Sequence, residues 1–237
     1  MQINLKKEPK NPTIIHGSPG FGLVGSISTD FLINHLEMEE IGNIWLDDLP
    51  AMVAIHEGKL VQPLGIFYNE KYNVVVMHVV TVTKGNIEWK IADAVEQLAE
   101  RLKSKEVLCI EGVKATEEKE ETEVYYYTNN SEKQEGLKEK FKPLNEGVIV
   151  GVTSALLLKL SGEYPLTCMF AETHTNYPDS KAAAMVIKSL DQYLGFQVDY
   201  KPLLETAEMV EGKLKNLLSQ TSEMAKETER KKLSYVG

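Results

Sequence analysis

Cysteine and arginine are both scarce in this chain of 237 residues. Each of the two cysteines, Cys109 and Cys168, lies in an apolar run, which is typical of a small core residue in a reducing compartment. The two arginines are Arg101 and Arg230, whereas enzymes that act on phosphate groups usually hold them with bidentate guanidinium groups. We therefore expect no disulfide and no metal site, and a phosphate-processing role is disfavoured.

Long hydrophobic runs and an excess of positive charge are also missing. No apolar run reaches the roughly 18 residues of a membrane span, and the first residues lack the apolar core of a secretory signal. A cytoplasmic protein is therefore expected. The net charge of -9 argues against sequence-independent binding of nucleic acid, so basic faces of partner proteins are better candidates.

Glycine is concentrated in one stretch, which lies between the apolar run Thr13–Ile15 and a helical pattern from about Gly22 to Glu37. The residues of this structural glycine loop are Gly17, Pro19, Gly20, Gly22 and Gly25. Such a loop turns a buried strand into a helix, either to pack the helix closely on the strand or to cradle an anion. The spacing matches neither known phosphate-binding signature, and no lysine or arginine occurs between Lys10 and Lys59, which favours packing.

Apolar runs alternate with helical patterns along most of the chain. The runs read as buried strands are Val74–Val80, Val107–Ile110, Val148–Val152 and Leu166–Ala171, and a hairpin is expected from Ala51–Glu57 and Val61–Tyr68. A helix beginning at Asn86 joins two of these runs in a right-handed crossover. The sequence therefore predicts a three-layer α/β domain with a mainly parallel, mixed-edge sheet of roughly six to eight strands.

Titratable residues form one promising cluster, made of Glu172, His174 and Asp179 after the last buried strand. Ligand sites of open α/β sheets lie at such strand ends. Asp179 also occupies the expected N-cap of a helix that stops at Gly195, so capping and loop fixing are the favoured roles. His78 is read as a hydrogen-bonded core histidine.

Charged segments mark surface features rather than chemistry. Asp47 and Asp48 precede a proline and are interpreted as turn residues. The segment 114–123 is expected to be an exposed charged loop, with an acidic contact for a basic partner as the alternative. In the strand that follows, Val124–Thr128, at least one tyrosine should face outward.

The C-terminal segment carries a heptad pattern. Its apolar positions, spaced alternately four and three residues apart, are Leu203, Ala207, Val210, Leu214, Leu217, Thr221 and Met224. A helix over 203–233 would be ~45 Å long, longer than a sheet face of this domain needs. We therefore expect two parts, an α/β domain over 1–202 and a helix with a flexible tail over 203–237. The helix packs either on its own sheet or on another subunit.

Three motifs carry a resemblance to a known family. They are Gly17–Gly25, Gly147–Thr153, and Ala171–Thr173 followed by Tyr177–Asp179 and Ala182–Ala184. In this order they resemble the PAC2 family of proteasome assembly chaperones and their archaeal homologues, over roughly residues 12 to 212. The resemblance implies a nucleoside-phosphorylase-like core that serves as an interaction module.

The resemblance also implies what the protein does. It would be a non-enzymatic scaffold without a cofactor, a homo-oligomer (tetramer or pentamer) that binds 20S proteasome α subunits or a sister PAC2 chaperone. The residues expected in oligomer contacts are Leu203, Val210, Leu214, Leu217 and Met224, and those expected at the partner are Leu233, Tyr235, Val236 and Gly237. Tyr235 stands one place earlier than in the usual family ending. The alternative is a nucleotide or nucleoside enzyme with the glycine loop Gly17–Gly25 as anion cradle and Glu172 as base or ribose ligand.

Overall fold

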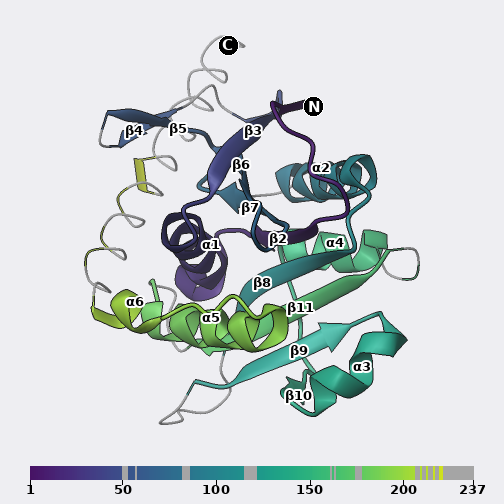
Figure 1. The fold of residues 1–237 in the computed structure, drawn as a ribbon. Coiled ribbons are helices and arrows are strands. Elements are labelled where there is room, and N and C mark those ends of the chain that lie inside the picture. Colours follow the sequence, from purple (N-terminus) through teal and green to yellow (C-terminus); the bar gives the residue numbers. More distant parts are fainter. Residues whose placement is uncertain are drawn as a thin grey trace, which may run out of the picture.

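The computed structural model describes most of the chain (Figure 1). The described residues are 1–49, 53–56, 58–81, 86–114, 122–160, 162, 164–173 and 178–205, with 209, 212, 216, 219 and 220 near the C-terminus.

A large sheet of nine strands forms the centre of the described fold. Its strands are β1 (Gln2–Leu5), β2 (Thr13–Gly17), β3 (Glu39–Trp45), β6 (Leu64–Asn69), β7 (Val74–Val79), β8 (Glu106–Lys114), β9 (Val124–Thr128), β10 (Lys142–Pro143) and β11 (Leu166–Thr173). Two further strands, β4 (Ala54–His56) and β5 (Lys59–Val61), form a separate hairpin. The helices are η1 (Phe21–Leu23), α1 (Val24–His35), α2 (Asn86–Leu102), α3 (Ser131–Lys138), α4 (Val152–Leu160), α5 (Ser180–Leu194) and α6 (Lys201–Glu205).

The strand order is β1-β3-β6-β7-β2-β8-β11-β9-β10. The central strands β7, β2, β8 and β11 run parallel, and antiparallel pairs flank them on both sides. The expected mixed α/β fold is thus confirmed. The sheet is wider than the six to eight strands predicted, because short flanking strands such as β1 and β10 carry no continuous apolar run.

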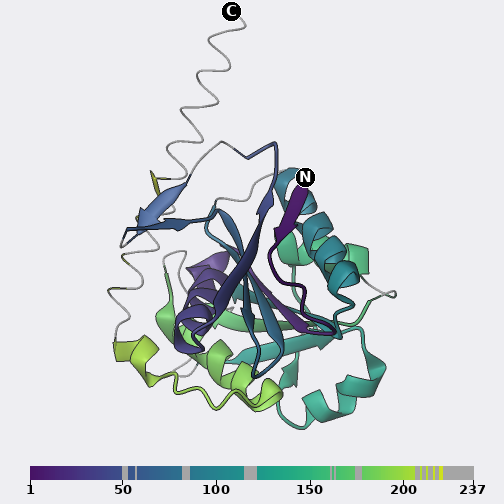
Figure 2. The ribbon, with the colours of Figure 1, turned by 45° about the horizontal axis from the view of Figure 1, so that its top comes forward.

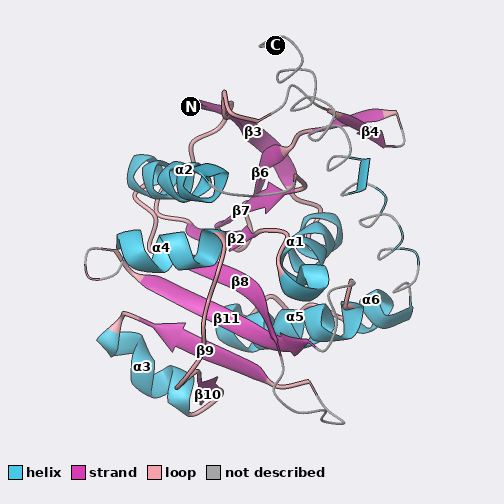
Figure 3. Cartoon of the chain, turned by 180° about the vertical axis from the view of Figure 1, so that it is seen from behind, coloured by secondary structure: helices cyan, strands magenta, loops and turns pink. Residues whose placement is uncertain are grey.

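Helices cover both faces of the sheet and make three layers (Figure 3). One apolar cluster joins α2 and α4 to the sheet, and the other joins α1 and α5 to the opposite face. Helix α1 buries Val24, Ile27 and Leu32 against the sheet. Because both faces are covered, every residue of β7 and of β11 is buried, which explains their unbroken apolar runs.

The two cysteines are buried free thiols, as expected. Cys109 of β8 and Cys168 of β11 stand opposite each other in register. They fill the core between the sheet and the layer of α2 and α4.

The hairpin expected from Ala51–Glu57 and Val61–Tyr68 is wrong in its second strand. β5 ends at Val61 and pairs with β4, whereas β6 begins at Leu64 and joins the main sheet between β3 and β7. Pro63 lies at the break and has no N–H to continue a ladder. Figure 2 shows the short hairpin standing apart from the main sheet.

Helix α5 begins and ends where its caps predict. The Asp179 carboxylate accepts a hydrogen bond from the N–H of Ala182 at 2.9 Å, and Gly195 ends the helix in a left-handed conformation with φ 72°. Both caps are confirmed.

The expected loop 114–123 lies mostly outside the described residues. Its two ends are part of the fold, since Lys114 ends β8 and the Glu123 carbonyl accepts a hydrogen bond from the Glu172 N–H. In β9, Tyr126 is buried and Tyr127 is exposed, which confirms that a tyrosine faces outward. No helix among the described residues is long and apolar enough to cross a membrane.

Candidate functional site

The loop between β2 and α1 places backbone directly against backbone. A Cβ atom on Gly17 would lie 2.3 Å from the carbonyl oxygen of Gly25, and one on Gly25 would lie 2.8 Å from the carbonyl oxygen of Ile110. Only glycine fits such approaches. These two glycines therefore let α1 begin directly beside the ends of β2 and β8.

Gly20 makes room for an acidic side chain rather than for backbone. A Cβ atom on Gly20 would lie 1.8 Å from Oε1 of Glu111. The glycine loop thus lies against a carboxyl group that projects from β8.

Glu111 is a buried acid with few polar neighbours. It is 6% exposed, and Thr153 Oγ1 donates a hydrogen bond to its Oε2 at 3.0 Å. Burial raises the pKa of the Glu111 carboxyl from 4.5 to about 8, although the hydrogen bonds from Thr153 and the Gly112 backbone act in the opposite direction. At neutral pH this carboxyl is therefore mostly protonated.

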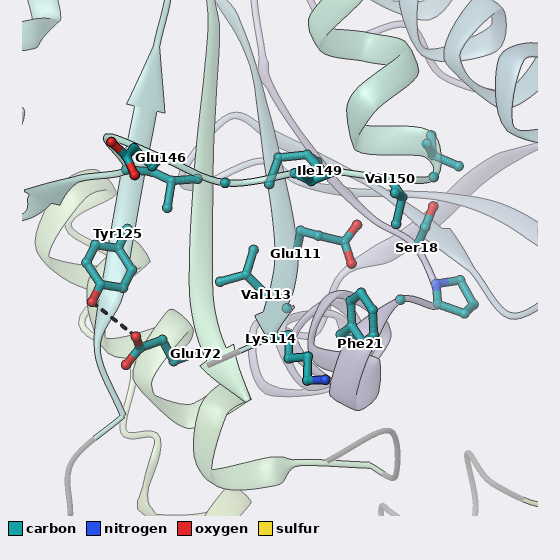
Figure 4. Close-up of a pocket in the computed structure, with 18 of the residues that line it drawn as sticks. Ser18, Phe21, Glu111, Val113, Lys114, Tyr125, Glu146, Ile149, Val150 and Glu172 are labelled. Carbon is teal, nitrogen blue, oxygen red and sulfur yellow. Dashed lines mark hydrogen bonds between the residues drawn. The ribbon is translucent and has the colours of Figure 1, made fainter. Parts of the chain in front are cut away.

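Glu111 shares one sheet face with two other polar side chains, Tyr125 and Glu172. Phe170 of β11 is in register with both Glu111 of β8 and Tyr125 of β9, and Glu172 stands two residues further along β11. Side chains alternate along a strand, so Glu111, Tyr125 and Glu172 point the same way. The Tyr125 hydroxyl has one proton and two carboxyl acceptors, Glu123 Oε2 at 2.7 Å and Glu172 Oε1 at 3.2 Å, of which the second is drawn in Figure 4.

These side chains line a cavity of about 1020 Å³ at the carboxyl end of the parallel strands. The glycine loop, from Ser18 to Phe21, forms one wall, and the segment 143–152 forms another. Cavities at this edge of an α/β sheet are where such folds bind ligands.

The apolar run Val148–Val152 does not form the buried strand that its sequence predicts. Val148 is 89% exposed and Val150 is 57% exposed, and the run leads directly into α4 as a rim of the cavity. Both edges of β11 are already occupied, by β8 and by β9, so no position beside it is open to this segment. Its apolar side chains face the cavity and solvent instead.

Two histidines lie buried beneath the glycine loop. Nε2 of His16 is 2.8 Å from Ser18 Oγ, and Nδ1 of His78 is 2.8 Å from Thr29 Oγ1. Burial, with a further contribution from His78, lowers the pKa of His16 to about 4. The interpretation of His78 as a hydrogen-bonded core histidine is confirmed.

The other acidic candidates are spread over the fold. Asp47 pairs with the N-terminal amine and Asp48 with Lys90, both at exposed positions away from the cavity. Asp179 caps α5 and also accepts a hydrogen bond from Thr173 at 2.8 Å. Of the predicted cluster, Glu172 lines the cavity and Asp179 is not part of its described lining. His174 lies outside the described residues.

The sequence analysis missed Glu111. The available signal was a lone glutamate that directly follows the apolar run Val107–Ile110 and precedes Gly112. In the described part of the chain, no three His, Cys, Asp or Glu side chains are grouped so that they could hold a metal ion.

The C-terminal residues are described only at a few positions. Leu203 is buried in the chain's own core beside α5. The remaining residues expected in oligomer or partner contacts lie outside the described part: Val210, Leu214, Leu217, Met224, Leu233, Tyr235, Val236 and Gly237.

These features define a three-layer α/β protein with a ligand-sized cavity at the carboxyl edge of its parallel strands. The chain belongs to the PAC2 family, whose sequence profile matches residues 14–218. The resemblance inferred from the glycine loop and the later motifs is thus confirmed.

Solved structures with the same fold include two from Pyrococcus furiosus. PbaA, described as an archaeal homolog of proteasome-assembly chaperone, is 30% identical over 94% of this chain and 99% of its own, with a TM-score of 0.84. PbaB, described as an archaeal proteasome activator, is 20% identical over 91% and 98%, with a TM-score of 0.72, which shows the fold alone. In sequence, the uncharacterized protein MJ0106 of Methanocaldococcus jannaschii is 25% identical over 98% of this chain and 95% of its own.

Proposed function

We propose that this chain is a non-enzymatic, oligomeric scaffold that binds 20S proteasome α subunits or a related PAC2-family chaperone. The observation that supports this proposal is the likeness to PbaA, which extends over nearly the whole of both chains at 30% identity. The heptad pattern beyond Leu203 supplies the surface for oligomer contacts in this proposal, and the ending from Leu233 to Gly237 supplies the partner contact.

Co-purification tests the proposal. The full chain is co-expressed with proteasome α subunits, and the mass of the intact complex is measured under native conditions. A stable complex that contains both proteins is the expected result. A chain that elutes alone when it is co-expressed with α subunits, and again when it is co-expressed with a related PAC2 chaperone, would contradict the proposal.

A glutamine variant separates a scaffold from an enzyme. Glu172→Gln keeps the size of the side chain but removes a carboxylate of the cavity. We expect full partner binding with slightly lower stability. Complete loss of function in a folded Glu172→Gln protein would instead favour catalysis.

A small-molecule enzyme is the second candidate, because the glycine loop and Glu172 line one cavity. It predicts that a nucleotide, nucleoside or phosphate raises the melting temperature in proportion to the logarithm of its concentration. It also predicts that Glu172→Gln weakens this effect. A flat response to all three ligands would contradict it.

A further inference from the structure

The described lining of the cavity has an unbalanced set of charged side chains. Its described lining contains four glutamates and one lysine, and these residues are Glu88, Glu111, Glu146, Glu172 and Lys114. A concave wall with an excess of one sign concentrates ligands of the opposite sign. Even with Glu111 protonated, three glutamates stand against one lysine in this described lining, which favours a cation.

The most deeply placed of these carboxyls has no cationic partner among the described residues. Glu111 accepts hydrogen bonds from Thr153 and the Gly112 backbone. Glu106, at the opposite end of the same strand, does have a cationic partner, since Lys133 Nζ lies 2.6 Å from its Oε2. A buried carboxyl is stabilised when a positive group pairs with it, and the side of Glu111 that faces the cavity is where such a group can enter.

Apolar side chains surround the Glu111 carboxyl in the cavity. Figure 4 shows Glu111 between Ile149 and Val150 on one side and Phe21 on the other. Phe21 is 38% exposed and Val150 is 57% exposed. A ligand that reaches Glu111 would therefore pass along hydrocarbon, and would gain by burying an apolar stem there.

We propose that this cavity binds a primary amine on an apolar stem, with the ammonium group paired with Glu111 and the stem lying along Phe21, Ile149 and Val150. Two sources share this chemistry, a free alkylamine and the lysine side chain of an extended peptide. The site does not depend on the scaffold function, since its described lining includes no residue beyond Glu172.

An anion fits the same place poorly. Oε1 of Glu111 stands against the Gly20 backbone, at the point where an anion cradled by the glycine loop would have to lie. A second acidic side chain, Glu172, stands on the same sheet face, and the lysine of the described lining is Lys114.

Amine binding changes the protonation of Glu111. The other titratable or charged groups near it are Cys168 and Glu172 of β11, Glu88 of α2, and Lys114 at the end of β8. In the free protein Glu111 is largely protonated at pH 7, since its pKa is about 8. An alkylammonium has a pKa near 10 and stays charged, so its arrival ionises Glu111 and about one proton leaves for solvent.

Calorimetric titration with hexylamine tests the site, with hexanol as the uncharged control. We expect hexylamine to bind more tightly than hexanol. Its affinity should increase by up to about tenfold for each unit that the pH rises toward 8, and protons should be released on binding at pH 7. Glu111→Gln should weaken binding about tenfold or more and abolish the pH dependence. Glu139→Gln, at the exposed C-cap of α3, is the matched control and should leave both unchanged.

A blocked tripeptide Leu-Lys-Val, compared with the same peptide carrying norleucine for lysine, distinguishes the two sources. Tighter binding of the lysine peptide than of hexylamine identifies a peptide ligand, and the reverse order identifies a free amine. Both results support the site. Binding of hexanol as tight as that of hexylamine, binding unchanged in Glu111→Gln, or no binding of either amine overturns it.

Discussion

At the residue scale, Glu111 makes the stability of the fold depend on pH. Its pKa is about 8 in the folded chain, against an ordinary value of 4.5. The folded state therefore binds one more proton than the unfolded state between these pH values. Stability contributed by the protonated form is fully present below pH 4.5 and is lost as the pH rises through 8, by about 1.4 kcal/mol per pH unit.

We expect Glu111→Gln to remove this slope. The free energy of unfolding of the variant minus that of the wild type should rise by on the order of 3 kcal/mol from pH 5 to pH 8 and level off above. Urea titrations at several pH values measure it. Because the pKa of His16 is about 4 in the fold, the free energy of unfolding also decreases as the pH falls below 6.5. This contribution is the same in both proteins and cancels in the difference. Parallel curves for the two proteins would show that Glu111 is not buried as described.

Gly20 is constrained by a neighbouring side chain rather than by its backbone angles. Its φ of −140° is open to any residue, but a Cβ atom would meet Glu111 at 1.8 Å. Gly20→Ala should therefore lower the free energy of unfolding by about 1–3 kcal/mol. Gly147→Ala is the control, because the nearest atom there is 3.7 Å away, and it should change stability by less than about 0.5 kcal/mol. Equal stability of the two variants would contradict the contact.

At the element scale, the run Val148–Val152 on the cavity rim differs in exposure from the buried strands that it resembles in sequence. Its valines alternate with other residues as in a strand, yet Val148 is almost fully exposed. The strand β7, with a similar composition, is covered by helices on both faces. Burial therefore depends on which position in the sheet is open, not on the apolar composition of the run.

One substitution made in both elements measures this difference. Val148→Ala should change the free energy of unfolding by less than about 0.5 kcal/mol, whereas Val76→Ala in β7, fully buried, should lower it by about 2 kcal/mol. Chemical denaturation of both variants checks the pair. Comparable losses would place Val148 in the core after all.

At the scale of the whole molecule, folding and assembly should separate at the C-terminus. Among the described residues, the members of both apolar clusters extend no further than Leu203. A chain that ends after Leu218 should therefore keep its melting temperature within a few degrees but lose native mass and partner binding, if the heptad segment joins subunits. Native mass measurement and pull-down check this.

A second truncation assigns the role of the tail. Removing only Tyr235–Gly237 should keep the oligomer and weaken partner binding. If both truncations retain the full-length mass and full partner binding, the C-terminal segment only covers its own domain.

The sequence by itself determined what local interactions decide. The runs Val74–Val80 and Leu166–Ala171 are buried strands because they are apolar on both faces, and Asp179 and Gly195 bound a helix because capping involves only a few neighbours. The glycine loop and Glu172 were found at strand ends for the same reason. The family followed from motifs that can be read directly in the chain.

Only the tertiary structure decided which groups meet. The order β7-β2-β8-β11 brings the glycine loop beside Glu111, a residue far from Gly20 in the sequence, and burial in the folded chain raises the pKa of this carboxyl. The same order leaves no sheet position for the run at Val148 and makes it a cavity rim. Strand order and burial depend on contacts between distant segments, which no local pattern encodes.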